Sequence, residues 1–177
     1  QGQVLPSFGN TRTGTSGMQF LKIPLDARSA AMGGAFSCVS DDASATFWNP
    51  AAMIRSKNRQ EYTAGNINWF AGSNCQYVAA FGSYKSHTRY GFFVSSLSFQ
   101  KLKETTEFQP FGTGRTFTPV SQQIGFSYAK QLTDQFSFGV NTKWAYEGIA
   151  GAAINNLMFD LGIRYDLDIK HLRFAVT

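Results

Sequence analysis

The sequence predicts an all-β fold: the N-terminal half of a transmembrane antiparallel β-barrel, preceded by a plug segment that contains short helices. Strand-like segments recur after residue 59, and one face of the later segments carries no charge. A run of small residues with a carboxylate pair precedes the first strand. We divide the 177 residues into an N-terminal extension and plug over 1–57 and the first six to seven barrel strands over 58–177.

The N-terminal part combines an irregular stretch with two capped helices. Residues 1–25 are rich in Gly, Thr and Ser and predict an extended segment, and Gln1 is interpreted as a mature N-terminus left after removal of a secretion signal. Asp26 is expected to cap a helix over 27–32 that Gly33-Gly34 ends. Asn49 is expected to cap a second helix over 51–54, with Pro50 in its first turn.

Alternating residues predict strands near 60–70, 75–85, 88–100, 120–131, 136–147, 157–167 and 171–177. One face of the later strands is uncharged and carries Ile124, Phe126, Tyr128, Phe136, Phe138, Val140, Thr142, Trp144, Tyr146, Leu157, Phe159, Leu161, Ile163 and Tyr165. The opposite face carries small and polar residues together with the charges Lys143, Glu147, Asp160, Arg164 and Asp166. This separation fits a barrel wall with lipid outside and a polar interior, because a Lys or Arg at the bilayer midplane costs about 2–4 kcal/mol.

The uncharged face is compatible with two environments, membrane lipid or the core of a soluble protein. Tyr128, Trp144, Tyr146 and Tyr165 lie toward strand ends, where an aromatic girdle would meet lipid headgroups. A soluble β-sandwich with one face in its core gives the same alternation and stays open as an alternative.

Connection lengths favour the barrel. The turns at 85–88, 132–135 and 168–170 are short, while the connections at 101–119 and 148–156 are longer and fall on the other rim. The connection at 70–74 is short although it belongs to the long-loop rim. Six or seven strands leave open edges in lipid, so we expect the chain to be one half of a longer barrel protein.

The sequence predicts no catalytic residues, cofactor or metal. His87 and His171 lie in predicted turns without a Ser or Cys that an Asp could activate. The adjacent carboxylates Asp41 and Asp42 fit helix capping or an Arg pair better than a cation site. Lys143, Glu147, Asp160 and Arg164 are expected to form a network of ion pairs in the lumen, with a solute path as the alternative.

The remaining positive charges and the cysteines suggest no further chemistry. The positive residues are scattered apart from Arg55, Lys57 and Arg59, which we assign to a membrane rim and not to nucleic acid. Cys38 and Cys75 do not make a disulfide framework, and free, partly buried thiols are the simpler interpretation.

The segment 101–119 carries three phenylalanines among Gly, Thr and Pro: Phe108, Phe111 and Phe117. Exposed aromatic side chains reduce solubility unless something covers them. They either fold over the mouth of the barrel or form a contact site for a partner chain or an apolar ligand.

The segment DDASATFWNPAAM over 41–53 resembles the Asp-Asp-Ala and Asn-Pro-Ala signature that precedes the first strand of FadL-like outer-membrane proteins. The longer string MQFLKIPLDARSAAMGGAFSCVSDDASATFWNPAAM over 18–53 is similar to the PorV/PorQ family, associated with type IX secretion in the Bacteroidota. The resemblance places structural residues of the plug and its turn into the wall at Gly33, Gly34, Ala35, Asp41, Asp42, Ala43, Ser44, Trp48, Asn49, Pro50 and Ala51. The two carboxylates would cap amides or pair with an Arg such as Arg28, and Gly33-Gly34 would allow a close backbone approach.

The resemblance implies a non-enzymatic protein of the bacterial outer membrane. PorV-type relatives are similar in acting as partners of the secretion channel and as carriers of cargo with a C-terminal signal domain. The implied partners are outer-membrane lipid and a secretion channel or secreted cargo. A FadL-like transporter of hydrophobic small molecules is the second hypothesis, and a soluble all-β binding module is the third.

Overall fold

The structure is a computed structural model that describes residues 17–149, 152–167, 169 and 172–177. Its N-terminal segment contains the short helices η1 (Gln19–Lys22), α1 (Ala27–Ala31), α2 (Ala45–Trp48) and η2 (Pro50–Arg55). Asp26 caps α1 by accepting hydrogen bonds from two backbone amides, and Asn49 caps η2 by accepting one from Ala51. Both predicted helices are confirmed, although the second is a 3-10 helix, and η1 and α2 were not predicted.

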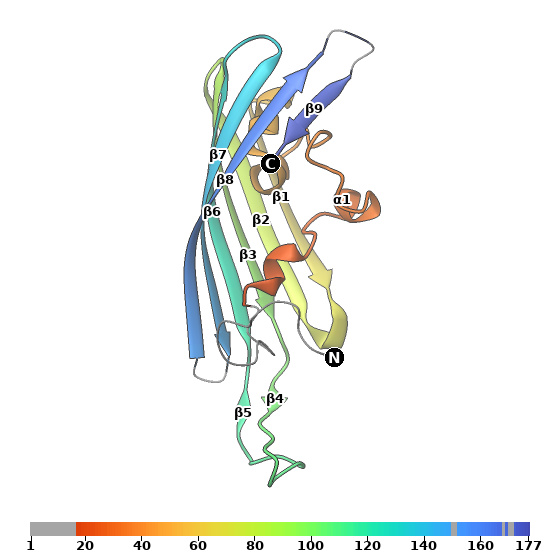
Figure 1. The fold of residues 1–177 in the computed structure, drawn as a ribbon, viewed down its shortest axis with the longest axis vertical. Helices are drawn as coiled ribbons and strands as arrows, with labels where there is room; N and C mark the ends of the chain where they lie inside the picture. The colour runs from red at the N-terminus through yellow and green to blue at the C-terminus, as the bar shows by residue number, and fades with distance from the viewer. Residues whose placement is uncertain (1–16, 150–151, 168, 170–171) are drawn as a thin grey trace, which may run out of the picture.

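The strands are β1 (Gln60–Asn68), β2 (Asn74–Lys85), β3 (Thr88–Ser98), β4 (Leu102–Lys103), β5 (Thr116–Phe117), β6 (Val120–Gln131), β7 (Phe136–Ile149), β8 (Ala152–Asp166) and β9 (Arg173–Val176). Seven of them form one antiparallel sheet in the order β1-β2-β3-β6-β7-β8-β9, which curves into a half-barrel (Figure 1). The short 3-10 turn η3 (Phe70–Gly72) joins β1 to β2. β4 and β5 pair with each other in a separate hairpin that extends beyond one end of the sheet.

All seven predicted strands are present, but one predicted loop is wrong. The longer connection expected over 148–156 is largely strand, because β7 and β8 stay paired as far as Ile149 and Ala152. Gly148, Ala152 and Ala153 give no alternation of apolar and polar side chains, yet backbone pairing does not require it. One long connection, 99–119, therefore marks this end of the described sheet, which we call the long-loop end. The predicted turn at 168–170 lies mostly outside the described residues.

The alternation of faces follows the predicted phase. The outward side chains of β6, β7 and β8 are mostly exposed or half-exposed, and Leu161 keeps 70% of its surface. The inward positions are mostly buried, as at Ser127 and Asn141. One charged residue, Lys130, lies on the outward face at the end of β6, in register with Thr88 on β3.

The N-terminal segment lies on the concave side of this sheet, while α1 projects away from it (Figure 1). Helix η2 contacts β6, β7 and β8, and α2 contacts β2, β3 and β6. Apolar clusters join the segment to the wall, including Met53 with Phe81 and Phe20 with Leu97. Across the described ranges, no helix combines the length and hydropathy that a membrane crossing needs.

Candidate functional site

The turn at Asn49 and Pro50 is fitted to the wall by two glycines. Both residues are fully buried against Gly162 on β8 and Gly139 on β7. A Cβ atom at Gly162 would lie 2.3 Å from the side-chain oxygen of Asn49, and one at Gly139 would lie 2.5 Å from the amide nitrogen of Ala51. The absence of side chains at these two wall positions is therefore what admits the turn.

Asn49 connects three parts of the chain through its amide. Its Oδ1 accepts a hydrogen bond from the Ala51 backbone at 3.1 Å. Its Nδ2 donates to the carbonyl of Ser37 at 3.2 Å and to that of Ile163 on β8 at 3.4 Å. A buried amide whose donors and acceptor are all used fixes one orientation of the turn.

Polar side chains on the wall satisfy carbonyl groups of the N-terminal segment. Ser127 Oγ and Asn141 Nδ2 both donate to the carbonyl of Thr46, at 3.0 and 2.8 Å. Ser137 Oγ donates to the carbonyl of Ala51 at 3.1 Å. These contacts join the segment to β6 and β7, and an unpaired carbonyl at such a buried position would cost about 1–3 kcal/mol.

Arg89 holds the end of η2, a role that the sequence did not predict. Its guanidinium donates to the carbonyl of Ser56 at 2.7 Å and to that of Met53. It also lies over the ring of Phe81, 5.0 Å from the centroid. The sequence offered no signal for it, because the strand at 88–100 carries apolar residues on both faces, and only the register with Ala129 shows that Arg89 points inward.

Arg28, Asp41 and Asp42 meet outside the concavity. Arg28 Nη1 lies 2.8 Å from Asp42 Oδ2 and 3.5 Å from Asp41 Oδ1. Asp42 Oδ1 also accepts hydrogen bonds from the amide of Ser44, at 2.9 Å, and from its hydroxyl. Because the Arg28 and Asp41 side chains are about half exposed, the ion pair contributes less than about 1 kcal/mol.

The other motif residues are distributed between surface and core. Gly33 and Gly34 adopt positive φ angles of 62° and 83°, and apart from the adjacent residues no described atom lies within 4 Å of a Cβ built on either. The expected close backbone approach is therefore wrong: these glycines serve the left-handed turn after α1. Ala35 is exposed and Ala43 is buried. Trp48 is partly buried and packs edge-on against Phe36.

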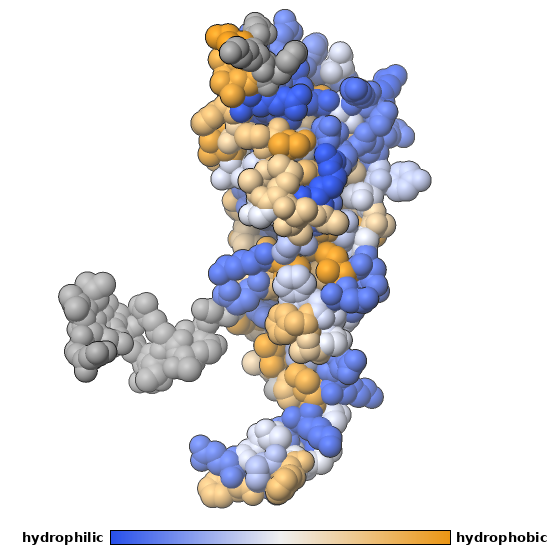
Figure 2. Space-filling model, turned by 90° about the vertical axis from the view of Figure 1, so that its right-hand side faces the viewer, coloured by the Kyte–Doolittle hydropathy of each residue, from blue (hydrophilic) through white to orange (hydrophobic). Residues whose placement is uncertain are grey.

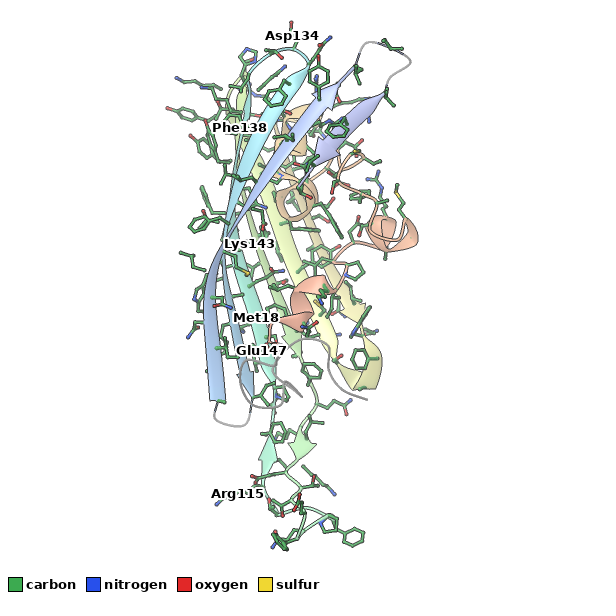
Figure 3. The ribbon with its side chains drawn as sticks, viewed as in Figure 1. Met18, Arg115, Asp134, Phe138, Lys143 and Glu147 are labelled. Carbon is green, nitrogen blue, oxygen red and sulfur yellow. The ribbon has the colours of Figure 1, made fainter. Side chains whose placement is uncertain are left out.

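The four predicted lumenal charges do not form one network in the described chain. Lys143 Nζ pairs with Asp160 Oδ2 at 2.5 Å, whereas Glu147 accepts a hydrogen bond from the amide of Met18 (Figure 3). Arg164, with only 2% of its surface exposed, pairs with Asp166 at 3.0 Å. The four charged residues do not form a single cluster, because β7 and β8 are long and place these side chains at different positions along the strands.

Asp166 receives a second cation from the N-terminal segment. Arg55 Nε lies 2.5 Å from its other carboxylate oxygen. Arg55 also donates to the carbonyl of Asp134 in the turn between β6 and β7, at 2.6 Å. This cluster lies at the end of the concavity opposite the long loop, which we call the short-turn end, and its pairing was not predicted.

The β4–β5 hairpin carries two of the three predicted phenylalanines at its tip. Phe108 and Phe111 expose 93% and 97% of their surface, while Phe117 lies at the base of the hairpin, opposite Leu102 and partly buried. The tip forms an apolar group at the bottom of the space-filling view (Figure 2). The hairpin extends beyond the end of the described sheet (Figure 1).

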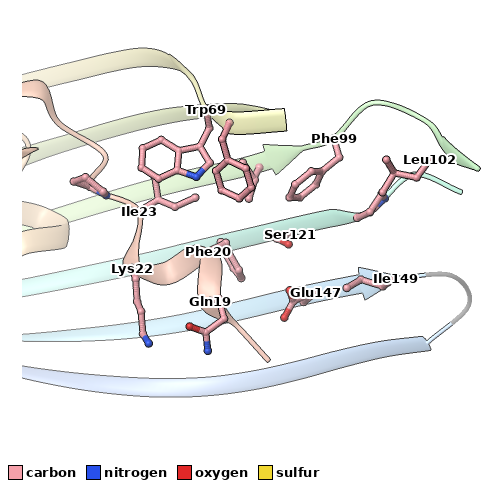
Figure 4. A pocket seen from close by; sticks show the side chains of 14 residues that line it. Gln19, Phe20, Lys22, Ile23, Trp69, Phe99, Leu102, Ser121, Glu147 and Ile149 are labelled. Atoms are coloured by element: carbon pink, nitrogen blue, oxygen red, sulfur yellow. The ribbon is translucent and has the colours of Figure 1, made fainter. Parts of the chain in front are cut away.

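A largely apolar pocket opens between this hairpin and η1 (Figure 4). Its volume is about 430 Å³, and Phe20, Ile23, Trp69, Phe70, Leu97, Phe99, Leu102 and Ile149 supply most of its wall. Lys22, Gln19 and Glu147 also line it. Sequence reasoning missed the pocket, because its residues come from five separate stretches of the chain: 19–24, 69–70, 97–102, 119–121 and 147–149.

The remaining candidate residues, the histidines and the cysteines, do not come together in a common site. His87 is exposed and lies 3.4 Å from Gln131, and His171 lies outside the described residues. Cys38 and Cys75 are free thiols. In the part of the chain that the structure describes, no three His, Cys, Asp or Glu residues converge in a way that would hold a metal ion.

These features define a class of protein: a half-barrel of antiparallel strands whose concave face is occupied by its own N-terminal segment. The profile of the family described as "Type IX secretion system protein PorV" matches residues 7–157. The chain therefore belongs to this family, as its N-terminal motif predicted, and is involved in type IX secretion at the cell envelope. A comparison with curated proteins found no match.

Proposed function

We propose that the half-barrel is part of an outer-membrane β-barrel that serves type IX secretion as a non-enzymatic accessory. It binds a protein partner, the secretion channel or a secreted cargo protein, at the long-loop end. The N-terminal segment acts as the plug, with Arg28, Asp42, Asn49 and Pro50 in structural roles. The observation that carries partner binding is the pair of uncovered phenylalanines, Phe108 and Phe111.

The outward face supports a location in lipid. Phe159 and Leu161 on β8 expose well over half of their surface, and no second layer of the described chain covers them. A soluble sandwich would need such a layer over this face. Acyl chains cover apolar side chains without that requirement, which favours the membrane over the soluble module.

Two aromatic groups on this face lie where the proposed membrane boundaries would be. Near the short-turn end, Tyr128 contacts the rings of Tyr90 and Phe138. Toward the long-loop end, Trp144 stacks on Tyr146 at a centroid distance of 6.2 Å. Tyr146 follows Phe138 by eight positions on β7, about 27 Å along the strand and about 20 Å across a bilayer at a tilt near 40°. That separation approaches the apolar band of about 25 Å in outer-membrane barrels.

The hairpin tip is suited to protein contact because it offers aromatic side chains on a projecting element. Aromatic residues in the centre of an interface commonly contribute more than 1 kcal/mol each to binding. Replacing Phe108 and Phe111 together by Ser should lower co-purification of the secretion channel or cargo from solubilised membranes about tenfold or more. The barrel should fold normally, because neither ring packs against the sheet.

A matched control replaces Ile169 and Leu172 by Ser at the short-turn end, where both side chains are also exposed. This variant should keep wild-type partner recovery and wild-type release of cargo into the medium. Equal recovery by the Phe108/Phe111 variant and the wild type would refute partner binding at the tip.

The apolar pocket favours transport of hydrophobic small molecules as a second candidate function. Its volume of about 430 Å³ lies in the range of small-molecule sites. Recovery of a bound lipid from the purified protein, together with undisturbed secretion in the Phe108/Phe111 variant, would favour this transporter over the accessory role.

A further inference from the structure

The outward face changes its chemistry sharply at the long-loop end. Strand register places Asn66, Gln76, Ser96 and Gln122 side by side on β1, β2, β3 and β6. Across Tyr146 on β7, the same row reaches Asn155 on β8. A second row beyond it contains Asn68, Asn74 and Ser98. We call these eight residues the amide rows.

The next row toward the middle of the wall is apolar. In register it contains Ala64, Val78, Val94, Ile124, Trp144 and Leu157. Amide side chains facing acyl chains would leave their donors and acceptors unpaired, at a cost of about 1–3 kcal/mol each by protein data. The amide rows therefore fit the headgroup layer, directly beside the apolar band.

Most of the amide rows retain free hydrogen-bonding capacity. Asn74 Nδ2 donates to Asn68 Oδ1 at 2.9 Å. The side chains of Asn66, Gln76 and Gln122 are exposed and make no hydrogen bond to another described residue. Each amide offers both donors and an acceptor, a combination that matches the hydroxyl groups of sugars.

The amide rows differ in charge from the other boundary, and also from the hairpin at their own end, which carries Lys101, Lys103 and Arg115. The amide rows contain no ionisable side chain, so they lack the cations that would pair with phosphate. At the short-turn end, by contrast, Lys130 follows the outward face of β6, and Lys85 Nζ lies 5.6 Å from the ring centre of Tyr84. Lysine beside tyrosine fits an anionic headgroup at that boundary, whereas neutral amides do not.

An aromatic pair adjoins the amide rows. Trp144 and Tyr146 lie on the outward face of β7 with their rings inclined by only 22°. Tyr146 is in register with Gln122 on one side and Asn155 on the other. A flat ring beside amides offers an apolar surface to the C–H face of a sugar ring and hydrogen bonds to its hydroxyls.

We propose that the amide rows bind the neutral sugar headgroups of membrane glycolipids. This inference rests on the proposed membrane location of the wall. It adds a ligand class and assigns it to one part of the wall: uncharged polyhydroxylated headgroups on the amide rows, which hold no cation of their own.

The test uses the full chain in phosphatidylcholine nanodiscs that also contain a minor amount of digalactosyl diacylglycerol or of phosphatidylglycerol. Native mass spectrometry counts the lipids that stay bound when the disc is removed. The variant Asn66→Ala/Gln76→Ala/Gln122→Ala should retain about fivefold less glycolipid than the wild type, as expected for the loss of several exposed hydrogen bonds. Its retention of phosphatidylglycerol should not change.

The matched control, Lys85→Ala/Lys130→Ala, should retain glycolipid like the wild type. Equal glycolipid retention by the amide variant and the wild type would overturn the inference and leave the membrane location intact. A wild-type chain that stays outside the discs would overturn the membrane location and the inference together.

Discussion

The carboxylate of Glu147 on β7 accepts a hydrogen bond of 2.5 Å from the backbone amide of Met18, 129 positions earlier in the chain. Met18 itself has a φ of 60°, a left-handed conformation that is unfavourable for a residue other than glycine. One side chain of the wall thus holds the start of η1 in a strained backbone geometry, beside the apolar pocket.

Removing this acceptor should loosen the N-terminal segment. In Glu147→Leu we expect amide hydrogen exchange over residues 18–23 to become at least about tenfold faster, because a bond worth about 1.5–3 kcal/mol to a charged group is lost. Glu147→Gln keeps an acceptor oxygen and should change exchange much less. Identical exchange in the Leu variant and the wild type would show that the contact does not hold the segment.

Adding one methyl group to the wall should disturb the Asn-Pro turn. Gly162→Ala would bring a Cβ atom to 2.3 Å from the buried side chain of Asn49, and such overpacking costs about 1–3 kcal/mol of folding free energy. Gly82→Ala is the control, since the nearest atom to its Cβ is 3.8 Å away on Gln60. Urea unfolding in detergent micelles measures both variants, and equal stability would contradict the packing.

Two aspartates should differ strongly in their contribution to stability. Asp166→Ala leaves the buried guanidinium of Arg164 and that of Arg55 without a carboxylate, which should lower the free energy of unfolding by about 3 kcal/mol. Asp41→Ala removes an exposed partner of Arg28 and should cost less than about 1 kcal/mol. Comparable losses in the two variants would refute the distinction drawn from burial.

The pocket can be filled from a single position. Ser121 lines it, whereas its neighbour Gln122 faces outward. Ser121→Trp should therefore abolish the fluorescence of an apolar probe such as N-phenyl-1-naphthylamine added to the purified protein, while Gln122→Trp should leave it unchanged. Full probe binding by the Ser121 variant would mean that the probe binds elsewhere.

Much of the wall could be predicted because each of its strands places alternate residues in two different environments. Ile124, Trp144 and Leu157 on one face contrast with Ser127, Asn141 and Arg164 on the other, and this contrast sets the phase of the strands. The start of β8 was missed since Ala152 and Ala153 carry no such contrast. The β4–β5 hairpin was missed because two residues per strand give no period.

The contacts of the N-terminal segment were harder to predict. Arg89 and Arg55 donate to the carbonyls of Ser56 and Asp134, and every residue has a carbonyl, so no motif reveals such partners. The Arg28–Asp42 pair could be predicted, because both side chains lie in one short motif. The apolar pocket could not be predicted, because segments that are distant in the sequence meet there only after the sheet has curved.

The hydrogen bonds between the N-terminal segment and the sheet also have a kinetic consequence. The carbonyl of Ser40 accepts a hydrogen bond from Arg164, 124 positions later, and the amide of Met18 donates one to Glu147, 129 positions later. The N-terminal segment is therefore synthesised first, but its contacts with the sheet are among the last to form. Contacts of such sequence separation slow folding, because a long loop must close before they form. Until β7 and β8 join the sheet, this segment stays an unfolded, partly apolar stretch of chain that is open to other contacts.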